Sequence, residues 1–260
     1  MSESAKSPHF RRFINGILVG VWFAALLHKP APSGLDPWLL LLAALANLLA
    51  LNQQLPLQNV LGAAAGAAVI GLAAQVGSVK TGIPLGPMIF TGETTGKLFN
   101  LVPFTIPFLW ILAIFTARGV ARLCLRPWRT GRMYGFQLIG LTALLTMLFD
   151  FCLEPYAWRI KHWWLWSPTK IAISWQGVSP LNFLGWLITS LLILAIITPC
   201  LIRKKPGNPS PVDWQPLAYW LGAMVLFSVA YVRAGLVAPL VATLVIGGLI
   251  SALAWRFARW

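Results

Sequence analysis

Long apolar runs separated by short polar stretches occupy almost the whole chain. A helix needs about 20 mainly apolar residues to cross the hydrocarbon core of a bilayer. Eight runs approach that length, and because the second is short, seven spans is the alternative count. The pattern predicts an all-α polytopic transmembrane helix bundle with spans at Phe10 to Leu27, Trp38 to Leu51, Val60 to Val79, Leu101 to Leu123, Tyr134 to Leu153, Pro180 to Ile202, Leu217 to Val232 and Leu236 to Trp255.

The segments between the spans give no sign of a second domain. Residues 1–260 are therefore interpreted as one integral membrane domain, and the proline-rich stretch from Arg203 to Pro216 as a connecting loop. The first span follows basic residues and lacks a clear cleavage site after it, which favours a retained signal-anchor helix. Gly62 and Gly66 form a small-x-x-x-small pattern that predicts close helix packing.

Composition supports a membrane protein and argues against soluble classes. Hydrophobic residues make up 58% of the chain and charged residues 10%, against about 25% charged in typical soluble domains. The net charge of +14 would suit a nucleic-acid partner, but the basic residues form short clusters between apolar runs. Cys124, Cys152 and Cys200 lack metal-ligand spacing. No nucleic-acid partner, disulfide framework or metal site is therefore predicted.

Lysine and arginine set the predicted orientation, because cytoplasmic loops hold the excess of these residues. With eight spans and an inside amino terminus, thirteen of the 20 basic residues lie inside and seven outside. Both termini are therefore predicted to be cytoplasmic, in a multi-pass protein of the cell (inner) membrane. The five arginines from Arg118 to Arg132 are interpreted as topology determinants, with contact to anionic lipid headgroups as the alternative.

Two of the six acidic residues, Asp150 and Glu154, stand four positions apart at the end of an apolar run. On a helix they share one face, and Pro155 places Glu154 near the helix end, at the outer membrane boundary. Two close carboxyl groups with little solvent disfavour double ionisation, so one is expected to hold a proton and to be available as a general acid. In the structural alternative they cap the helix or pair with Arg159, Lys161 or Lys97.

A tryptophan-rich segment follows these carboxylates. The commonest role of tryptophan at such a position is an interfacial aromatic belt. An alternative for one or two of the rings is to stabilise a carbocation, since an aromatic face attracts positive charge by about 0.5–2 kcal/mol. The residues concerned are Trp158, Trp163, Trp164, Trp166 and Trp175.

A second polar stretch runs from Val79 to Trp110, where four glycines, four prolines and Glu93 interrupt an apolar chain. Such breaks at membrane depth are tolerated where they line a cavity or are buried in protein. In the predicted topology this stretch lies on the same outer side as the carboxylates, so Glu93, Asp150 and Glu154 are expected to converge. The alternative is an ordinary loop with turn residues.

Both polar stretches resemble signatures of one known family. "TGIPLGP" followed by "GKLFNLVPFTIPFLW" resembles its first signature, and "DFCLEP", the tryptophan-rich segment and "WQGVSPLNFLGW" resemble its second. This is the membrane carotenoid-biosynthesis family that includes the CruF-type carotenoid hydratases and bisanhydrobacterioruberin hydratase. The resemblance covers residues 81–110 and 150–186, both predicted on the outer face. The chain departs from the family pattern at Met88, Ile89 and Trp175, where tyrosines are usual, at Glu154, where an aspartate is usual, and at an extra Ser179.

The resemblance implies a cofactor-independent addition of water across the terminal double bond of an acyclic carotenoid end, giving a tertiary alcohol. Protonating such an alkene gives a tertiary carbocation, which requires an acid, surroundings that tolerate positive charge and one positioned water. The implied partners are a lipophilic carotenoid, water and the lipid bilayer. The implied catalytic residues are Asp150, Glu154 and Glu93. The implied substrate-binding residues are Trp163, Trp164, Trp166, Trp175, Asn182, Trp186, Pro84 and Gly86.

Two other functions would use the same architecture. A transporter or channel would employ the three carboxylates as a proton or cation relay and would predict inverted repeats, of which the sequence gives no convincing sign. A non-catalytic protein that holds carotenoid or lipid would not require the acids. Substitution of the carboxylates therefore distinguishes a binding protein from a hydratase.

Overall fold

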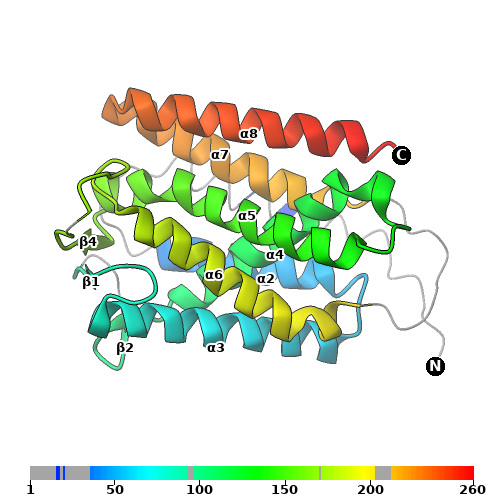
Figure 1. Cartoon of the computed structure of the whole chain (residues 1–260), viewed down its shortest axis with the longest axis horizontal. Helices are drawn as coiled ribbons and strands as arrows, with labels where there is room; N and C mark the ends of the chain where they lie inside the picture. Colours follow the sequence, from blue (N-terminus) through cyan, green and yellow to red (C-terminus); the bar gives the residue numbers. More distant parts are fainter. Residues whose placement is uncertain (1–15, 18–19, 21–35, 93–95, 170, 203–211) are drawn as a thin grey trace.

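The computed structural model describes residues 16–17, 20, 36–92, 96–169, 171–202 and 212–260. Over these ranges the chain forms a bundle of long helices with short strands at one end (Figure 1). Most of the first predicted span, Phe10 to Leu27, lies outside the described residues, and so does Glu93. The helices are α2 (Asp36–Leu51), α3 (Leu57–Thr81), α4 (Ile106–Cys124), α5 (Tyr134–Glu154), α6 (Pro180–Ile197), α7 (Gln215–Ala234) and α8 (Val237–Phe257).

The six helices from α3 to α8 are long and apolar enough to cross a bilayer. Over the described part of the chain, they confirm the predicted all-α polytopic bundle. α2 has 16 residues, fewer than the 20 or so that a perpendicular span requires. The second predicted segment is therefore a helix, but a short one, as its sequence indicated.

One predicted helix boundary is wrong, and the end of another span has a different helix type, both for local reasons. The fourth span was expected from Leu101, but α4 begins at Ile106 because the residues before it form a small hairpin of β2 (Lys97–Leu98) and β3 (Val102–Pro103). The sixth was expected to reach Ile202, and the helical span does continue to Leu201, but α6 itself ends at Ile197 and its last turn, Thr198–Leu201, is a tighter 3₁₀ turn. Pro199 lies in this turn, and proline cannot supply the backbone N–H that an α-helix needs.

Helix α4 runs through the middle of the bundle. It contacts α2, α3, α5, α7 and α8, and 78% of its apolar span is buried inside the protein, against 28% for α8. A helix that is apolar on all sides is either surrounded by protein or exposed to lipid. Helix α4 is surrounded by protein, whereas α8 lies at the edge of the bundle (Figure 1) and is exposed to lipid.

Glycines on α3 allow its neighbours to approach closely, as the small-residue pattern predicted. A Cβ added at Gly66 would lie 2.7 Å from Cγ2 of Ile197, and one at Gly62 would lie 3.6 Å from Sγ of Cys200. One turn further along, a Cβ at Gly71 would overlap the ring of Trp110 at 2.2 Å. These contacts bring α3 closely against both α4 and α6.

Candidate active site

The two polar stretches of the sequence meet at one end of the bundle. Strand β1 (Met88–Phe90) pairs antiparallel with β4 (Trp164–Trp166), so that Phe90 lies opposite Trp164 and Met88 opposite Trp166. Backbone hydrogen bonds extend the pairing on both sides, from Thr91 N to the Trp163 carbonyl and from Ser167 N to the Pro87 carbonyl. Figure 1 shows this pair beside the end of α5 and the start of α6. The structure thus joins segments that are about 75 residues apart in sequence.

Asp150 and Glu154 lie on the buried face of the last turn of α5. Their side chains are 0% and 1% exposed, so they lie inside the protein and not on its surface. The α-helix ends at Glu154, as Pro155 indicated, and one wider π-helical turn continues to Ile160. After this turn the chain reaches β4 (Trp164–Trp166), which provides two further residues of the site, Trp164 and Trp166.

Three neutral side chains donate hydrogen bonds to the two carboxyl groups. Asn182 Nδ2 lies 2.6 Å from Asp150 Oδ2 and 3.1 Å from Glu154 Oε1, so one amide bridges the pair. The indole nitrogens of Trp164 and Trp166 lie 3.1 Å and 3.0 Å from Glu154 Oε2. Both oxygens of Glu154 are therefore satisfied by N–H donors, and all of these donors are uncharged.

The backbone explains why these donors point at the carboxylates. Trp164 and Trp166 alternate with Leu165 along β4, and alternate residues of a strand face the same side. Asn182 lies in the first turn of α6, which begins at Pro180 after a Ser179 cap whose hydroxyl accepts from Leu181 N. The donors thus come from two separate elements, each held by its own backbone hydrogen bonds.

Two of the cations considered as ion-pair partners make other contacts. Lys97 Nζ donates to the Phe90 carbonyl at 2.7 Å, and Arg159 donates to the side-chain oxygen of Gln176. The third, Lys161, lies 5.9 Å from the centre of the Tyr156 ring. The carboxyl pair is instead held by amide and indole N–H groups, which distinguishes it from a surface ion-pair network.

One oxygen of the cluster is left without a partner. Asp150 Oδ1 is buried and makes no hydrogen bond to any described residue, whereas Glu154 accepts three. Hydrogen bonds from N–H groups stabilise the ionised form of a carboxyl, and burial disfavours a second negative charge beside it. The arrangement therefore suits a carboxylate at Glu154 and a proton on Asp150. A buried carboxylic acid of this kind can donate its proton to a substrate.

In a comparison with family models, residues 35–250 match the model described as carotenoid biosynthesis protein. The chain belongs to this family. The match includes both strands of the β1–β4 pair and the carboxyl cluster. It shows that this membrane protein has a role in carotenoid biosynthesis. Comparisons with curated proteins and with solved structures gave no match.

In this family member the predicted substrate-binding residues fall into two groups. Asn182, Trp164 and Trp166 contact the carboxylates directly. Gly86 lies beside the Trp166 ring, since a Cβ added there would be 3.3 Å from it. Pro84 lies against α6, where its carbonyl oxygen would be 2.4 Å from a Cβ on Gly185.

The other three predicted tryptophans pack elsewhere. Trp186 stacks on Trp110 with ring centres 4.0 Å apart, one turn below Asn182. Trp175 stacks on Phe151 at 4.4 Å and donates to its carbonyl. Trp163 packs edge-on against Tyr156 at 5.7 Å. These rings shape the surroundings of the site without a hydrogen bond to either carboxylate.

Several residues that support the site were not singled out from the sequence. Gly185 allows the backbone at Pro84 and Leu85 to lie against α6, and Ser78 Oγ accepts a hydrogen bond from Leu85 N at 2.9 Å. Thr142 and Thr146 precede Asp150 at spacings of four on the buried face of α5, and their hydroxyls donate to carbonyls of their own helix. The spacing of four residues, which places both threonines on the same helix face as Asp150, was the signal in the sequence that could have identified them.

Among the described residues, no group of three or more His, Cys, Asp or Glu side chains is placed to hold a metal ion. The cluster of Asp150, Glu154 and Asn182 contains two carboxyl groups and one amide. Carboxyl groups can donate and accept protons, so these residues are equipped for acid–base chemistry.

Proposed function

We propose that this protein hydrates the terminal C=C bond of an acyclic carotenoid end group to give a tertiary alcohol. The observation that carries the proposal is the buried pair of Asp150 and Glu154, bridged by Asn182 and surrounded by tryptophans, in a member of the carotenoid biosynthesis protein family. Hydration of an alkene is redox-neutral, so it requires proton transfers and one water but no electron acceptor.

In the proposed first step, Asp150 donates its proton from Oδ1 to the CH carbon of the terminal double bond. The π electrons of that bond form the new C–H bond and leave a tertiary cation on the carbon that carries two methyl groups. Asp150 is assigned this role because its Oδ1 is the buried carboxyl oxygen without a hydrogen-bond partner among the described residues.

In the second step, a water oxygen forms the C–O bond at the cationic carbon, and the resulting oxonium loses a proton to a carboxylate. Glu154 stands four residues from Asp150 and is held as an acceptor by three N–H groups. Its negative charge would stabilise the cation, and the indole faces of Trp164 and Trp166 would add cation–π attraction. Return of the proton to Asp150 would complete the cycle.

Expression in a bacterium that accumulates lycopene tests the proposal. Membranes containing the wild-type chain should yield a more polar pigment heavier by one water, detected by chromatography with mass spectrometry. Asp150→Asn should abolish this pigment at equal membrane content of protein. Asp213→Asn removes a carboxyl at the other end of the bundle, where it accepts from Gln54, and should leave the pigment unchanged.

Two other outcomes would replace the proposal. Unchanged lycopene that co-purifies with the protein, whether or not Asp150 is substituted, would indicate a non-catalytic carotenoid-binding protein. Unchanged lycopene together with a carboxylate-dependent proton or cation flux into liposomes would indicate a transporter.

A further inference from the structure

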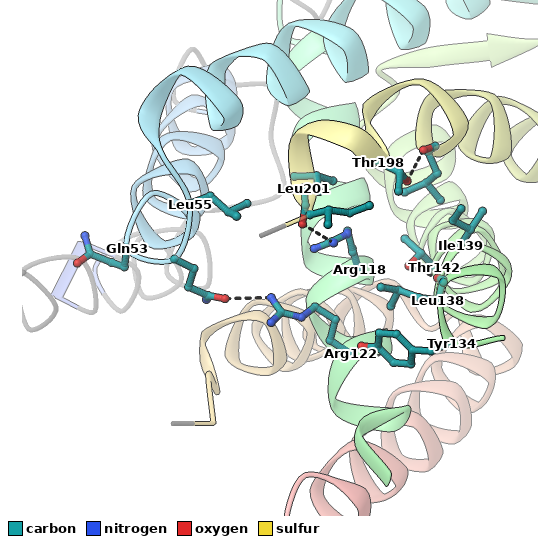
Figure 2. A pocket seen from close by; sticks show the side chains of 14 residues that line it. Gln53, Leu55, Arg118, Arg122, Tyr134, Leu138, Ile139, Thr142, Thr198 and Leu201 are labelled. Carbon is teal, nitrogen blue, oxygen red and sulfur yellow. Dashed lines mark hydrogen bonds between the residues drawn. The ribbon is translucent and has the colours of Figure 1, made fainter. Parts of the chain in front are cut away.

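A cavity lies at the opposite end of the bundle from the carboxyl cluster. It has a volume of about 430 Å³ and is lined by the α2–α3 connection, the last turns of α4, the first turns of α5 and the end of α6. Tyr134 and Thr142 contribute from α5, so the cavity begins about two turns before Asp150 on the same helix. Figure 2 shows the side chains around this space.

Two arginines give the cavity its charge. Arg118 and Arg122 are one helical turn apart on α4, so both side chains reach the same side of the helix. Arg118 donates to the Leu201 carbonyl at 3.1 Å, and Arg122 donates to Gln54 Oε1 at 2.9 Å, as drawn in Figure 2. None of the fourteen lining residues is acidic. The cavity therefore has a net positive lining.

Most of the hydrogen-bonding capacity of these guanidinium groups is unused within the described residues. A guanidinium has five N–H donors, and each of the two makes one hydrogen bond to a neutral oxygen. Paired arginine forks bind phosphate oxygens well because their planar geometry allows two parallel hydrogen bonds. The carboxylate of Asp213, which is nearby, accepts from Gln54 and from the backbone N–H of Gln215.

The rest of the lining is apolar. Leu55, Leu138, Ile139, Leu194 and Leu201 form a wall beside the two arginines. A ligand that fits both parts has a phosphate group joined to a hydrocarbon chain. A carotenoid end group has no anion to place against the arginines, so this cavity is unsuited to the substrate proposed above.

We propose that this inner cavity binds the phosphate of an anionic lipid, with Arg118 and Arg122 holding the phosphate and the leucine wall contacting the first part of the acyl chain. Basic pockets between transmembrane helices at the cytoplasmic side are suited to such headgroups, and the positive-inside pattern assigns this end of the bundle to that side. The neighbouring loop carries Arg126, Arg129 and Arg132, which raise the local positive charge further.

Native mass spectrometry of the full-length protein in detergent, with phosphatidylglycerol or phosphatidylcholine added, tests this site. The wild type should retain one phosphatidylglycerol in preference to phosphatidylcholine. The double variant Arg118→Gln/Arg122→Gln should bind phosphatidylglycerol about tenfold more weakly, the loss expected for charge-assisted hydrogen bonds. The matched control is Arg129→Gln/Arg132→Gln, which removes two exposed arginines from the α4–α5 loop and should retain the lipid within about twofold.

Three results would overturn the proposal. Equal loss in the loop control would mean that diffuse surface charge attracts the lipid, and equal retention of phosphatidylcholine would mean that no anion is recognised. Inorganic phosphate that displaces phosphatidylglycerol at equal concentration would assign the site to free phosphate. Because the glutamine pair removes a helix contact, Arg118→Lys/Arg122→Lys is the second variant. It keeps both charges and should bind more weakly than wild type but more tightly than the glutamine pair.

Discussion

The two polar sites of this bundle lie near opposite ends of α5 and differ in how their charged groups are compensated. At one end, Asp150 and Glu154 are fully buried and surrounded by neutral N–H donors. At the other, Arg118 and Arg122 line a cavity of about 430 Å³, and among the described residues each donates one hydrogen bond to a neutral oxygen. The first site has most of its hydrogen bonds in place among the described residues. At the second, a cavity lies beside N–H donors that have no partner among the described residues, so it has room for a phosphate group.

The difference follows from the segments that surround each end. The carboxyl cluster lies against the β1–β4 pair, whose Trp164 and Trp166 donate their indole N–H groups to Glu154. Among the described residues, the cavity is bordered by the short α2–α3 connection and the turn after α6, together with α4 and α5. A buried charge must be compensated where it lies, whereas a partly open one can be compensated by an incoming ion.

The largest expected effect separates the roles of the two acids. Asp150→Asn should lower the initial rate of carotenoid hydration by about a hundredfold or more, since removal of a general acid costs about 10²–10⁴. Glu154→Gln, which keeps an acceptor for the indoles, should lower it by about tenfold. The rates are measured in isolated membranes at equal protein content. A larger loss for Glu154→Gln than for Asp150→Asn would reverse the assignment of acid and carboxylate.

Removal of the bridge should affect both stability and activity. Asn182→Leu leaves two buried carboxyl oxygens without their donor and should lower the free energy of unfolding by about 2 kcal/mol, together with the hydration rate. Thermal unfolding in detergent measures the first effect. The control is Leu184→Ala on the half-exposed face of the same helix, expected to change stability by less than about 1 kcal/mol. An unfolding temperature for Asn182→Leu equal to that of wild type would show that the bridge is not stabilising.

The closeness of α6 to the first polar stretch can be tested with a methyl group. A Cβ at Gly185 would lie 2.4 Å from the Pro84 carbonyl oxygen and 2.9 Å from Leu85 Cα, so the backbone must move apart. Gly185→Ala should destabilise the protein by about 1–3 kcal/mol, as overpacking generally does. Gly248→Ala on α8 is the matched control, because nothing lies within 4 Å of its added Cβ. Equal melting temperatures for the two variants would contradict this packing.

Each indole donor should contribute less to the hydration rate than Asp150 does. Trp164→Phe or Trp166→Phe removes one of two N–H donors to Glu154 Oε2, and each should lower the hydration rate by up to about tenfold. The double variant leaves that oxygen without either indole and should lose more than the product of the two single losses. A double variant as active as either single one would show that the indoles only fill space.

The smallest expected effect is that of salt, which should weaken lipid binding at the arginine cavity but leave the hydration rate at the carboxyl cluster unchanged. A change from about 0.1 M to about 1 M salt shortens the screening length from about 10 Å to about 3 Å. Arg122 is exposed at the cavity, so retention of phosphatidylglycerol should fall by about two- to threefold. The hydration rate should stay constant, because screening is weak at fully buried groups such as Asp150. A parallel fall of both quantities would mean that the sites are equally open.

Much of the candidate site was predictable because its signals are local. The spacing of four placed Asp150 and Glu154 on one helix face, and Pro155 marked the end of that helix. The partners were less predictable. Trp163 and Trp164 are adjacent in sequence, yet one packs on Tyr156 and the other donates to Glu154. The three-residue strand β4 determines which of the two tryptophans faces Glu154. A strand this short gives no clear pattern in an apolar sequence.

The sequence by itself determined the membrane class, the long helices α3 to α8 and the family, because apolar run length and short motifs need no knowledge of the partners of a residue. Only the tertiary structure decided which donors meet which charges. Asn182 reaches Asp150 across 32 positions, and Arg118 meets the Leu201 carbonyl across 83. The physical reason is that a buried charge is satisfied by whatever group the packing of helices brings within about 3 Å, and that distance is set by the whole bundle.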